Sequence, residues 1–117
     1  MANPAKRKGT AFESAVRDYL NSEGIPARRV AQAGRYDEGD LHGVDPFILE
    51  CKAYANVADG LRDGVDQAVS EAVNAGKEYG AAVIKRPRRS VGSAYVAMPL
   101  SEFVRLLLEV RRGRGIA

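Results

Sequence analysis

The stretch 47–53 (Phe-Ile-Leu-Glu-Cys-Lys-Ala) constrains the fold more than any other part of the chain. Its apolar character is typical of a buried strand, and two charged residues, Glu50 and Lys52, lie near its end. Side chains of a strand alternate between two faces. Glu50 and Lys52 therefore share one face, and Cys51 points to the other. The chain must fold around a core strand that presents a carboxylate and an ammonium side by side.

Periodicity and turn residues divide the rest of the chain into helices and strands. Thr10 and Glu13 have the spacing of a capping box, which predicts that the first helix begins at Thr10. Gly24 and Gly80 are expected to end the first and second helices. The predicted strands are 27–33, 40–43, 47–53, 81–85 and 91–98, and the predicted helices are 10–23, 61–79 and 99–110. This order, α-β-β-β-α-β-β-α, predicts an α/β fold with a small mixed β-sheet flanked by helices.

The length of 117 residues is that of a single domain. We expect residues 1–9 to form a flexible basic arm, residues 10–112 a single domain, and residues 113–117 a tail. No apolar run reaches the 18 residues that a membrane span requires. One cysteine and one histidine exclude an internal disulfide, a multi-cysteine zinc site and histidine-rich metal sites. A single cysteine suits a reducing compartment, so we expect a cytoplasmic protein.

Charge is distributed unevenly along the chain. Residues 1–36 hold seven Lys/Arg against three Asp/Glu, residues 37–84 hold three against ten, and residues 85–117 hold eight against two. Two basic ends therefore flank an acidic middle. A protein that only coats nucleic acid has no use for a block of carboxylates. The pattern suits a protein that contacts phosphates at its edges and holds a metal ion in its centre.

Asp40 supplies a second carboxylate to the face of Glu50. It lies on a short predicted strand that precedes the core strand, in the glycine-containing segment 38–41. Two convergent carboxylates suit Mg²⁺, which takes one or two carboxylates and keeps its other positions for water and phosphate. Lys52 would then contact the scissile phosphate or orient the attacking water. This set is the minimum for metal-assisted phosphodiester hydrolysis. The alternative is a solvated Glu50–Lys52 ion pair with no catalytic role.

Four pieces of sequence, in this order, resemble the PD-(D/E)xK nuclease superfamily. They are Gly9 to Glu13 at the start of a helix, Gly39-Asp40, the run Ile48 to Lys52, and Gln67 in the second long helix. Within the superfamily the chain is most similar to the archaeal-type Holliday junction resolvases and their phage relatives. The resemblance covers roughly residues 7–98 and implies a restriction-endonuclease-like core. It also implies a Mg²⁺-dependent endonuclease that leaves 5′-phosphate and 3′-hydroxyl ends, with Mn²⁺ as a substitute metal.

The resemblance also implies roles for individual residues. Asp40, Glu50 and the carbonyl of Cys51 would hold the metal, and Lys52 would lie beside the attacking water. The first-helix acid Glu13 and the second-helix Gln67 would support the same site; alternatively, Glu13 only caps its helix and Gln67 is a plain helix residue.

Two departures from the family pattern stand out in the sequence. Gly39 replaces the proline that the family motif writes before the first acid. The loop 33–35 lacks the serine that many resolvases carry. If this loop takes part in cleavage, either Arg35 or Tyr36 replaces the serine or the activity is lower.

Basic residues beside the expected site predict DNA contacts. Two clusters on one small domain favour phosphate binding over scattered solvated charge. The candidate residues are Lys6, Arg7, Lys8, Arg29, Arg35, Lys85, Arg86, Arg88 and Arg89. No motif for reading bases is visible, so we expect recognition of DNA shape and backbone.

The expected partners are branched DNA with a four-way junction, or duplex DNA, and a second copy of the chain. Two symmetric cuts need two sites, which a two-fold homodimer supplies. The apolar segments 103–110 and 91–98 are the candidate interfaces. Three other functions stay open: another restriction or repair endonuclease of the superfamily, a non-catalytic DNA-binding protein of the same fold, and an intracellular interaction module. The resemblance extends to phage proteins that act in a bacterial host.

Overall fold

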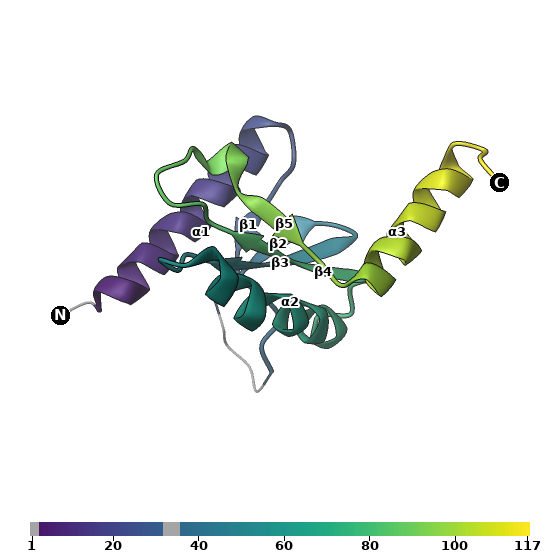
Figure 1. The fold of residues 1–117 in the computed structure, drawn as a ribbon. Helices are drawn as coiled ribbons and strands as arrows, with labels where there is room; N and C mark the ends of the chain where they lie inside the picture. The colour runs from purple at the N-terminus through teal and green to yellow at the C-terminus, as the bar shows by residue number, and fades with distance from the viewer. Residues whose placement is uncertain (1–2, 32–35) are drawn as a thin grey trace.

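A mixed β-sheet lies between two helices in the computed structural model, which describes residues 3–31 and 36–117 (Figure 1). The α/β class predicted from the sequence is confirmed. In the described residues the element order is α1 (Pro4–Ser22), β1 (Arg28–Arg29), β2 (Leu41–Val44), β3 (Phe47–Lys52), α2 (Val57–Asn74), β4 (Tyr79–Ile84), the 3₁₀ turn η1 (Val91–Ser93), β5 (Tyr95–Ala97) and α3 (Leu100–Gly113).

The sheet is mixed because one connection between its central strands runs through a helix. The spatial order in the described part of the chain is β1-β2-β3-β4-β5. β3 and β4 are parallel, in register from Phe47 opposite Tyr79 to Lys52 opposite Ile84, and α2 joins them. The other three neighbouring pairs are antiparallel. Consequently the carboxyl ends of β3 and β4, where Lys52 and Ile84 lie, meet at one edge of the sheet.

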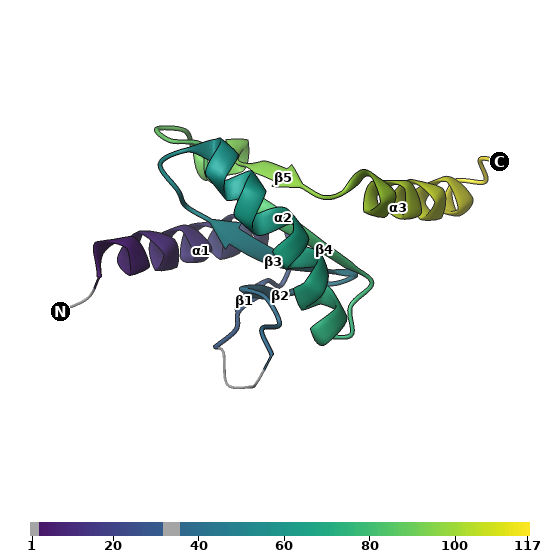
Figure 2. The ribbon, with the colours of Figure 1, turned by 60° about the horizontal axis from the view of Figure 1, so that its bottom comes forward.

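The two faces of the sheet are covered by different helices, α1 and α2, as Figure 2 shows from below. On the α1 side, Phe12 and Val16 form a buried cluster with Leu41 and Val83, against which Leu49 and Cys51 also pack. Because side chains alternate along a strand, Ile48, Glu50 and Lys52 of β3 point to the α2 side. Each face of β3 is therefore covered by its own helix.

The backbone of α2 lies very close to β4. A Cβ atom added to Gly80 would stand 2.0 Å from the carbonyl oxygen of Ala68. The sequence pattern had assigned Gly80 to the end of the second helix. Instead the residue lies inside a fully buried strand, because only a residue without a side chain permits this approach.

The first helix begins six residues earlier than the sequence predicted. Asn3 is its N-cap, and the Asn3 side chain accepts a hydrogen bond of 2.9 Å from the Ala5 N–H. Pro4 occupies the first turn, where its missing N–H leaves no bond unmade. Residues 4–9, expected to be a flexible arm, are thus helical. The predicted start at Thr10 is wrong, because that residue lies within α1.

The second helix is also displaced from its predicted bounds of 61–79. Asn56 is the N-cap of this helix, and its Oδ1 accepts a hydrogen bond of 2.8 Å from the Ala58 N–H. The helix ends at Asn74. Its buried residues are Gly60, Gly64, Ala68, Glu71 and Ala72. Leu61 and Val73, which were predicted for the inner face, are exposed. Small residues rather than large ones face the sheet because the helix packs so closely.

The outer strands are shorter than predicted. The predicted strand 27–33 is reduced to Arg28–Arg29, and part of it lies outside the described residues. The predicted strand 91–98 divides into the turn η1 and the short strand β5. The predicted strand 40–43 becomes Leu41–Val44, which leaves Asp40 just outside the ladder.

The last helix, α3, extends away from the sheet (Figure 1). The Tyr79 hydroxyl donates a hydrogen bond of 2.7 Å to Glu109, and the Arg105 guanidinium lies 5.0 Å from the centre of the Tyr79 ring. Large apolar side chains of α3 remain exposed: Leu100, Phe103, Val104, Leu107, Leu108 and Val110. Among the described residues, no helix combines the length and hydropathy needed to cross a membrane.

Candidate metal centre

Strand β3 places Glu50 and Lys52 on the face covered by α2. Glu50 is buried, with only 3% of its surface exposed. Lys52 packs against Gly64 of α2 through its aliphatic stem, while Cys51 packs on the α1 side. The alternation predicted for these three residues is therefore confirmed. Glu50 is not part of a solvated ion pair, because it is enclosed between the sheet and the helix.

Asp40 reaches the same site from the start of β2. Its backbone N–H donates to the Leu49 carbonyl at 3.0 Å, and its Oδ2 accepts a hydrogen bond of 2.8 Å from the Cys51 N–H. The carboxyl is thereby fixed beside Glu50. Burial, followed by the neighbouring Glu50 carboxyl, raises the pKa of Asp40 to about 8. The two predicted acids thus lie together, Asp40 directly before β2 and Glu50 on β3.

Burial likewise raises the pKa of Glu50 to about 8. The adjacent carboxyl of Glu71 adds to the rise, whereas Asp40 and Lys52 act in the opposite direction. The shift arises because the charged form loses its hydration between the sheet and α2, and like charges stand nearby. Such a pair holds protons at neutral pH until a cation compensates the negative charge.

Two further carboxylates, which the sequence analysis did not identify, complete the acidic group. Glu71 lies on the buried face of α2, and Asp37 lies in the segment before β2. One oxygen each from Asp37, Glu50 and Glu71 can be chosen so that all three lie within 4.8 Å of one another. Glu71 is four residues after Gln67, which places both on one helix face. This spacing could have indicated from the sequence that Glu71 belongs to the site. No feature of the sequence indicated Asp37.

The two supporting residues predicted from the resemblance lie at the edges of this group. Glu13 of α1 forms an ion pair of 3.4 Å with Arg29 of β1. Burial and then the charge of Asp40 raise the pKa of Glu13. Because α1 begins at Pro4, Glu13 does not cap its helix. Gln67 of α2 lies beside Glu71 and opposes the rise that burial causes in the pKa of Glu71.

Cys51 could offer a metal ion its backbone carbonyl rather than its thiol. Burial raises the pKa of the thiol, so the thiolate that binds metals is disfavoured. In a strand, the N–H and C=O of one residue point to the same neighbour. The Cys51 N–H points to Asp40, whereas the next carbonyl, of Lys52, accepts from the Lys85 N–H on the β4 side at 2.9 Å. The Cys51 carbonyl therefore faces the Asp40 side.

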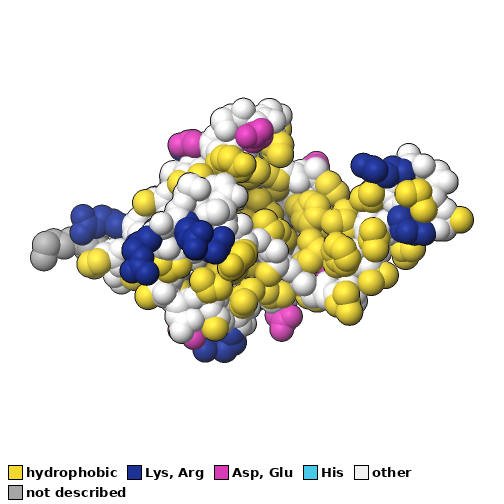
Figure 3. Space-filling view, turned by 45° about the horizontal axis from the view of Figure 1, so that its top comes forward, with side chains coloured by type: hydrophobic (Ala, Val, Ile, Leu, Met, Phe, Trp, Pro, Cys, Tyr) yellow, Lys and Arg dark blue, Asp and Glu magenta, His cyan; other side chains and the backbone are white. Residues whose placement is uncertain are grey.

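The predicted DNA-binding residues that the structure describes lie on α1, on β1 and in the loop after β4. Lys6, Arg7 and Lys8 are exposed on the first turns of α1, and Arg88 and Arg89 are exposed in the loop after β4. This loop begins at Lys85, directly beside the end of β3. Figure 3 shows basic side chains near the N-terminus and at the outer end of α3, with a hydrophobic surface between them.

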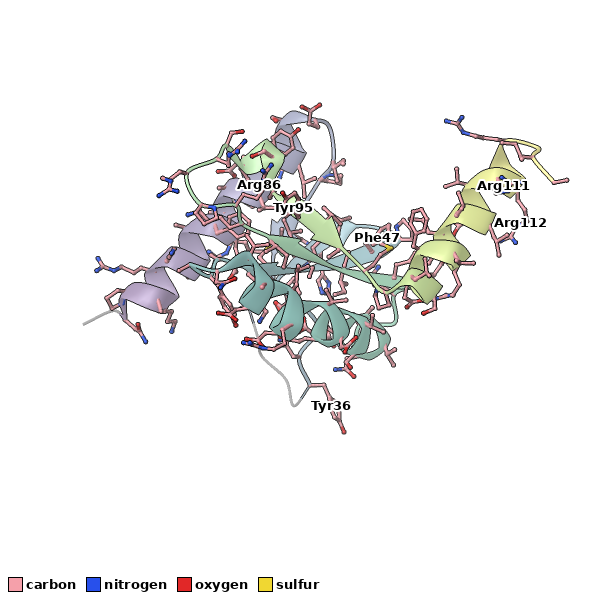
Figure 4. The ribbon with its side chains drawn as sticks, viewed as in Figure 1. Tyr36, Phe47, Arg86, Tyr95, Arg111 and Arg112 are labelled. Atoms are coloured by element: carbon pink, nitrogen blue, oxygen red, sulfur yellow. The ribbon has the colours of Figure 1, made fainter. Side chains whose placement is uncertain are left out.

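Two of the predicted basic residues are engaged within the protein. The Arg86 guanidinium lies 4.5 Å from the centre of the Tyr95 ring (Figure 4) and 3.5 Å from the Ser93 carbonyl oxygen. Arg29 pairs with Glu13. Arg35 lies outside the described residues, and neighbouring Tyr36 extends into solvent (Figure 4).

The residues present fit a hard divalent cation. Both oxygens of Glu71 are buried and have no hydrogen-bond partner among the described residues, so the donor set has unused lone pairs directed into the protein. All of the side-chain donors are carboxylates, the ligands that Mg²⁺ and Mn²⁺ prefer. The backbone carbonyl of Cys51 adds a donor of the same hard type.

Comparison with known proteins does not assign the chain to a family. No protein-family model matches the sequence, and no solved structure gives a significant match. A segment of 49 residues is 37% identical to an ATP phosphoribosyltransferase of Deinococcus deserti, over 42% of this chain. The matched part is 23% of that enzyme's length.

Proposed function

We propose that this chain is a Mg²⁺-dependent, structure-selective DNA endonuclease that resolves four-way junctions by phosphodiester hydrolysis. One observation carries the proposal: Asp40, directly before β2, lies beside Glu50 of β3, and Lys52 follows Glu50 on the same face. A protein that only binds DNA gains nothing from buried carboxylates near phosphate, because like charges repel.

The arrangement of elements supports a restriction-endonuclease-like core of the PD-(D/E)xK type. The acids lie on β2 and β3 or directly before them, Gln67 lies on the helix that joins β3 to β4, and Glu13 lies on the helix covering the other face. Gly39, at the family's proline position, has a φ of +95°. Proline is locked near −65° and does not fit there, which accounts for this departure from the motif.

The residues would divide the chemistry as follows. Asp40, Glu50 and the Cys51 carbonyl would hold Mg²⁺, or Mn²⁺ in its place. When bound, such an ion polarises a phosphate oxygen and lowers the pKa of a coordinated water. Lys52 is positioned at the end of β3, and its ammonium group lies 5.8 Å from the centre of the Tyr54 ring. It would stabilise negative charge that develops on the phosphate.

DNA would be held through its backbone by the exposed basic residues. The loop after β4 starts beside Lys52, so phosphates contacted by Arg88 and Arg89 would lie near the cleavage site. Contacts of this kind set position and orientation without reading sequence. We assign this activity to the cytoplasm, where the single cysteine would stay reduced.

A second copy of the chain would supply the second cut, with α3 as the interface. Its exposed apolar face would be covered by the same helix of the partner. Antiparallel pairing centred on Leu107 would set Glu102 opposite Arg112 and Arg105 opposite Glu109, so charges would be complementary. Two-fold symmetry is the usual arrangement of homo-oligomers and matches a two-fold junction.

The test compares cleavage of end-labelled four-way junction, flap, nicked and linear duplex DNA, with Mg²⁺ and with a chelator. The wild-type protein should cut the junction fastest, and only with metal. Glu50→Gln and Lys52→Ala should each lower the rate on the order of 100-fold or more while junction binding persists. Asp66→Asn, an exposed acid of α2, is the matched control and should cut normally.

Other results would select the remaining alternatives. Preference for linear or flap DNA indicates a different endonuclease of the superfamily. Salt-dependent binding without cleavage indicates a DNA-binding protein, and no binding at low salt indicates an interaction module. Normal cleavage by Glu50→Gln would remove the proposed mechanism.

A further inference from the structure

Glu71 is a buried carboxylate that has no basic partner among the described residues. Its residue exposure is 2%, and neither of its oxygens has a hydrogen-bond partner among the described residues. No lysine or arginine of residues 3–31 and 36–117 forms an ion pair with it. A buried carboxylate without a partner is strongly unfavourable, so such groups are normally paired or bound to a metal.

The neighbours of Glu71 increase the negative charge at this position. Oxygens of Asp37, Glu50 and Glu71 lie within 4.8 Å of one another. The segment that carries Asp37 is attached to α2, because the Asn74 side chain donates a hydrogen bond of 2.8 Å to the Asp37 carbonyl oxygen. Asp37 is therefore held beside the helix that carries Glu71.

Gly39 brings backbone without a side chain close to Glu71. An added Cβ at this residue would stand 3.3 Å from Glu71 Oε2 and 3.0 Å from Ile48 Cδ1. Its φ of +95° also disfavours other residues. At Gly39 the chain thus approaches the carboxylate with backbone alone.

We propose that Asp37, Glu50 and Glu71 form a second divalent-cation position, on the α2 side of Glu50. Three carboxylates supply hard oxygen donors, so the ion would be Mg²⁺, Mn²⁺ or a cation of the same class. Glu50 would be shared with the position held by Asp40 and the Cys51 carbonyl. The inference goes beyond the nuclease proposal, because it concerns binding of the ion and holds whether or not DNA is cut.

The experiment counts Mn²⁺ ions bound by the full chain without DNA, by electron paramagnetic resonance of the free ion during titration. Wild-type protein should bind two ions. Glu71→Gln keeps the shape of the side chain but removes its charge, and it should bind one ion, with affinity at the second position lowered at least about tenfold. Asp66→Asn, an exposed acid of the same helix, should bind two.

A second set of variants separates this inference from the nuclease proposal. Asp40→Asn should lose the other ion and retain the one at Glu71. If Glu71→Gln lowers binding but Asp40→Asn does not, the new position stands and the metal site assigned for cleavage fails. If the reverse holds, the cleavage site stands and the new position is overturned.

The inference also fails if the wild-type protein binds no Mn²⁺, since the carboxylates would then be held together by shared protons. Should Glu71→Gln not fold, Asp37→Asn provides the test, because Asp37 is only half-buried and lies outside the helices and strands. Unchanged Mn²⁺ affinity in that variant would then overturn the proposal.

Discussion

Glu50 is in contact with the rest of the site on two sides. Asp40 lies beside it on the neighbouring strand, and Glu71 faces it from α2. The pKa values of Asp40 and Glu50 are both raised to about 8, first by burial and then by neighbouring carboxyls. In the unfolded chain these groups have pKa values of about 4. The folded protein without metal therefore binds protons that the unfolded chain has already released.

This difference predicts that stability in the absence of metal falls as pH rises. Raised pKa values give stabilisation that is present below about pH 4 and is lost progressively up to about pH 8, because deprotonation of the folded cluster is unfavourable. Chemical denaturation with a chelator at pH 5 to 8.5 measures the trend. Asp40→Asn should flatten the profile, and Asp66→Asn should not. A profile that rises with pH would contradict the assignment.

Divalent cation should reverse the same trend. At pH 8 a much larger share of the Asp40 and Glu50 carboxyls is ionised than at pH 5, because their pKa values are about 8. Mg²⁺ that binds the folded protein and not the unfolded chain should then raise the unfolding temperature by mass action. The gain should be small at pH 5, where protons compete for the carboxylates. Thermal denaturation is measured without the ion and with the ion at 10 times its dissociation constant. By mass action, this concentration should stabilise the folded protein by about 1.4 kcal/mol. Equal gains at both pH values would be inconsistent with carboxylate ligands.

At the residue scale, the sequence predicted more of the site than of its surroundings. Glu50, Lys52 and Asp40 could be placed together because strand alternation is a strict rule. Glu71 was missed because a carboxylate on the inner face of a helix contradicts the usual pattern of burial. Asp37 was missed because it lies in no helix or strand, and its position depends on a hydrogen bond from distant Asn74.

Close packing determines the geometry of the elements. α2 rests on β3 and β4 through small residues, and Gly80 allows the backbone of Ala68 to lie against the strand. The sequence pattern treated glycines as ends of elements, which is their commoner meaning. The bounds of α2 and β4 were therefore wrong, whereas their existence and order were correct. The caps Asn3 and Asn56 would have given the true starts of α1 and α2.

Two glycine substitutions should have opposite effects on stability. Gly80→Ala forces α2 and β4 apart and should lower the free energy of unfolding by about 3 kcal/mol. Gly9→Ala meets no atom within 4 Å and lies inside α1, where alanine favours the helix by about 1 kcal/mol. Urea denaturation measures both. No stabilisation by Gly9→Ala would indicate that residues 4–9 are not helical in solution.

The whole molecule has an elongated shape, with principal extents of 54 × 34 × 28 Å. α3 and the first turns of α1 project from the sheet at opposite ends (Figure 2). Arg111 and Arg112 lie at the outer end of α3 (Figure 4). A helix with exposed leucine, valine and phenylalanine side chains is unfavourable in water on its own. The sequence predicted the helix and its apolar face, but periodicity alone could not say that the sheet leaves this face uncovered.

If two copies pair through α3, a charge at its centre should separate them. Leu107→Asp places a carboxylate at the proposed two-fold axis, where it would meet its own copy. Light scattering coupled to size-exclusion chromatography should show a dimer for the wild type and a monomer for the variant. Val73→Asp, at an exposed apolar residue of α2, serves as the control and should remain dimeric. A monomeric wild type would remove the α3 interface.

DNA binding should depend on salt through the exposed basic residues. Each phosphate contact contributes about 0.9 to the slope of log affinity against log salt. Arg88→Ala and Arg89→Ala should each remove one phosphate contact and so reduce that slope by about 0.9. Arg86→Ala should instead lower the unfolding temperature, because Arg86 stacks on Tyr95. Fluorescence anisotropy with a labelled junction at several salt concentrations distinguishes these roles. An unchanged slope in both loop variants would exclude this loop from the DNA interface.

The close contact between Gly80 and Ala68 bears on the ion selectivity expected of the proposed metal site. At Gly80 the close approach is to the backbone of Ala68, so no side-chain rotamer can change to make room for a larger residue. The distance between Glu50 on the strand and Glu71 on the helix therefore depends on the lack of a side chain at Gly80. If these acids bind a divalent cation as proposed, substitution of Gly80 should favour a larger ion without any change to the proposed ligands.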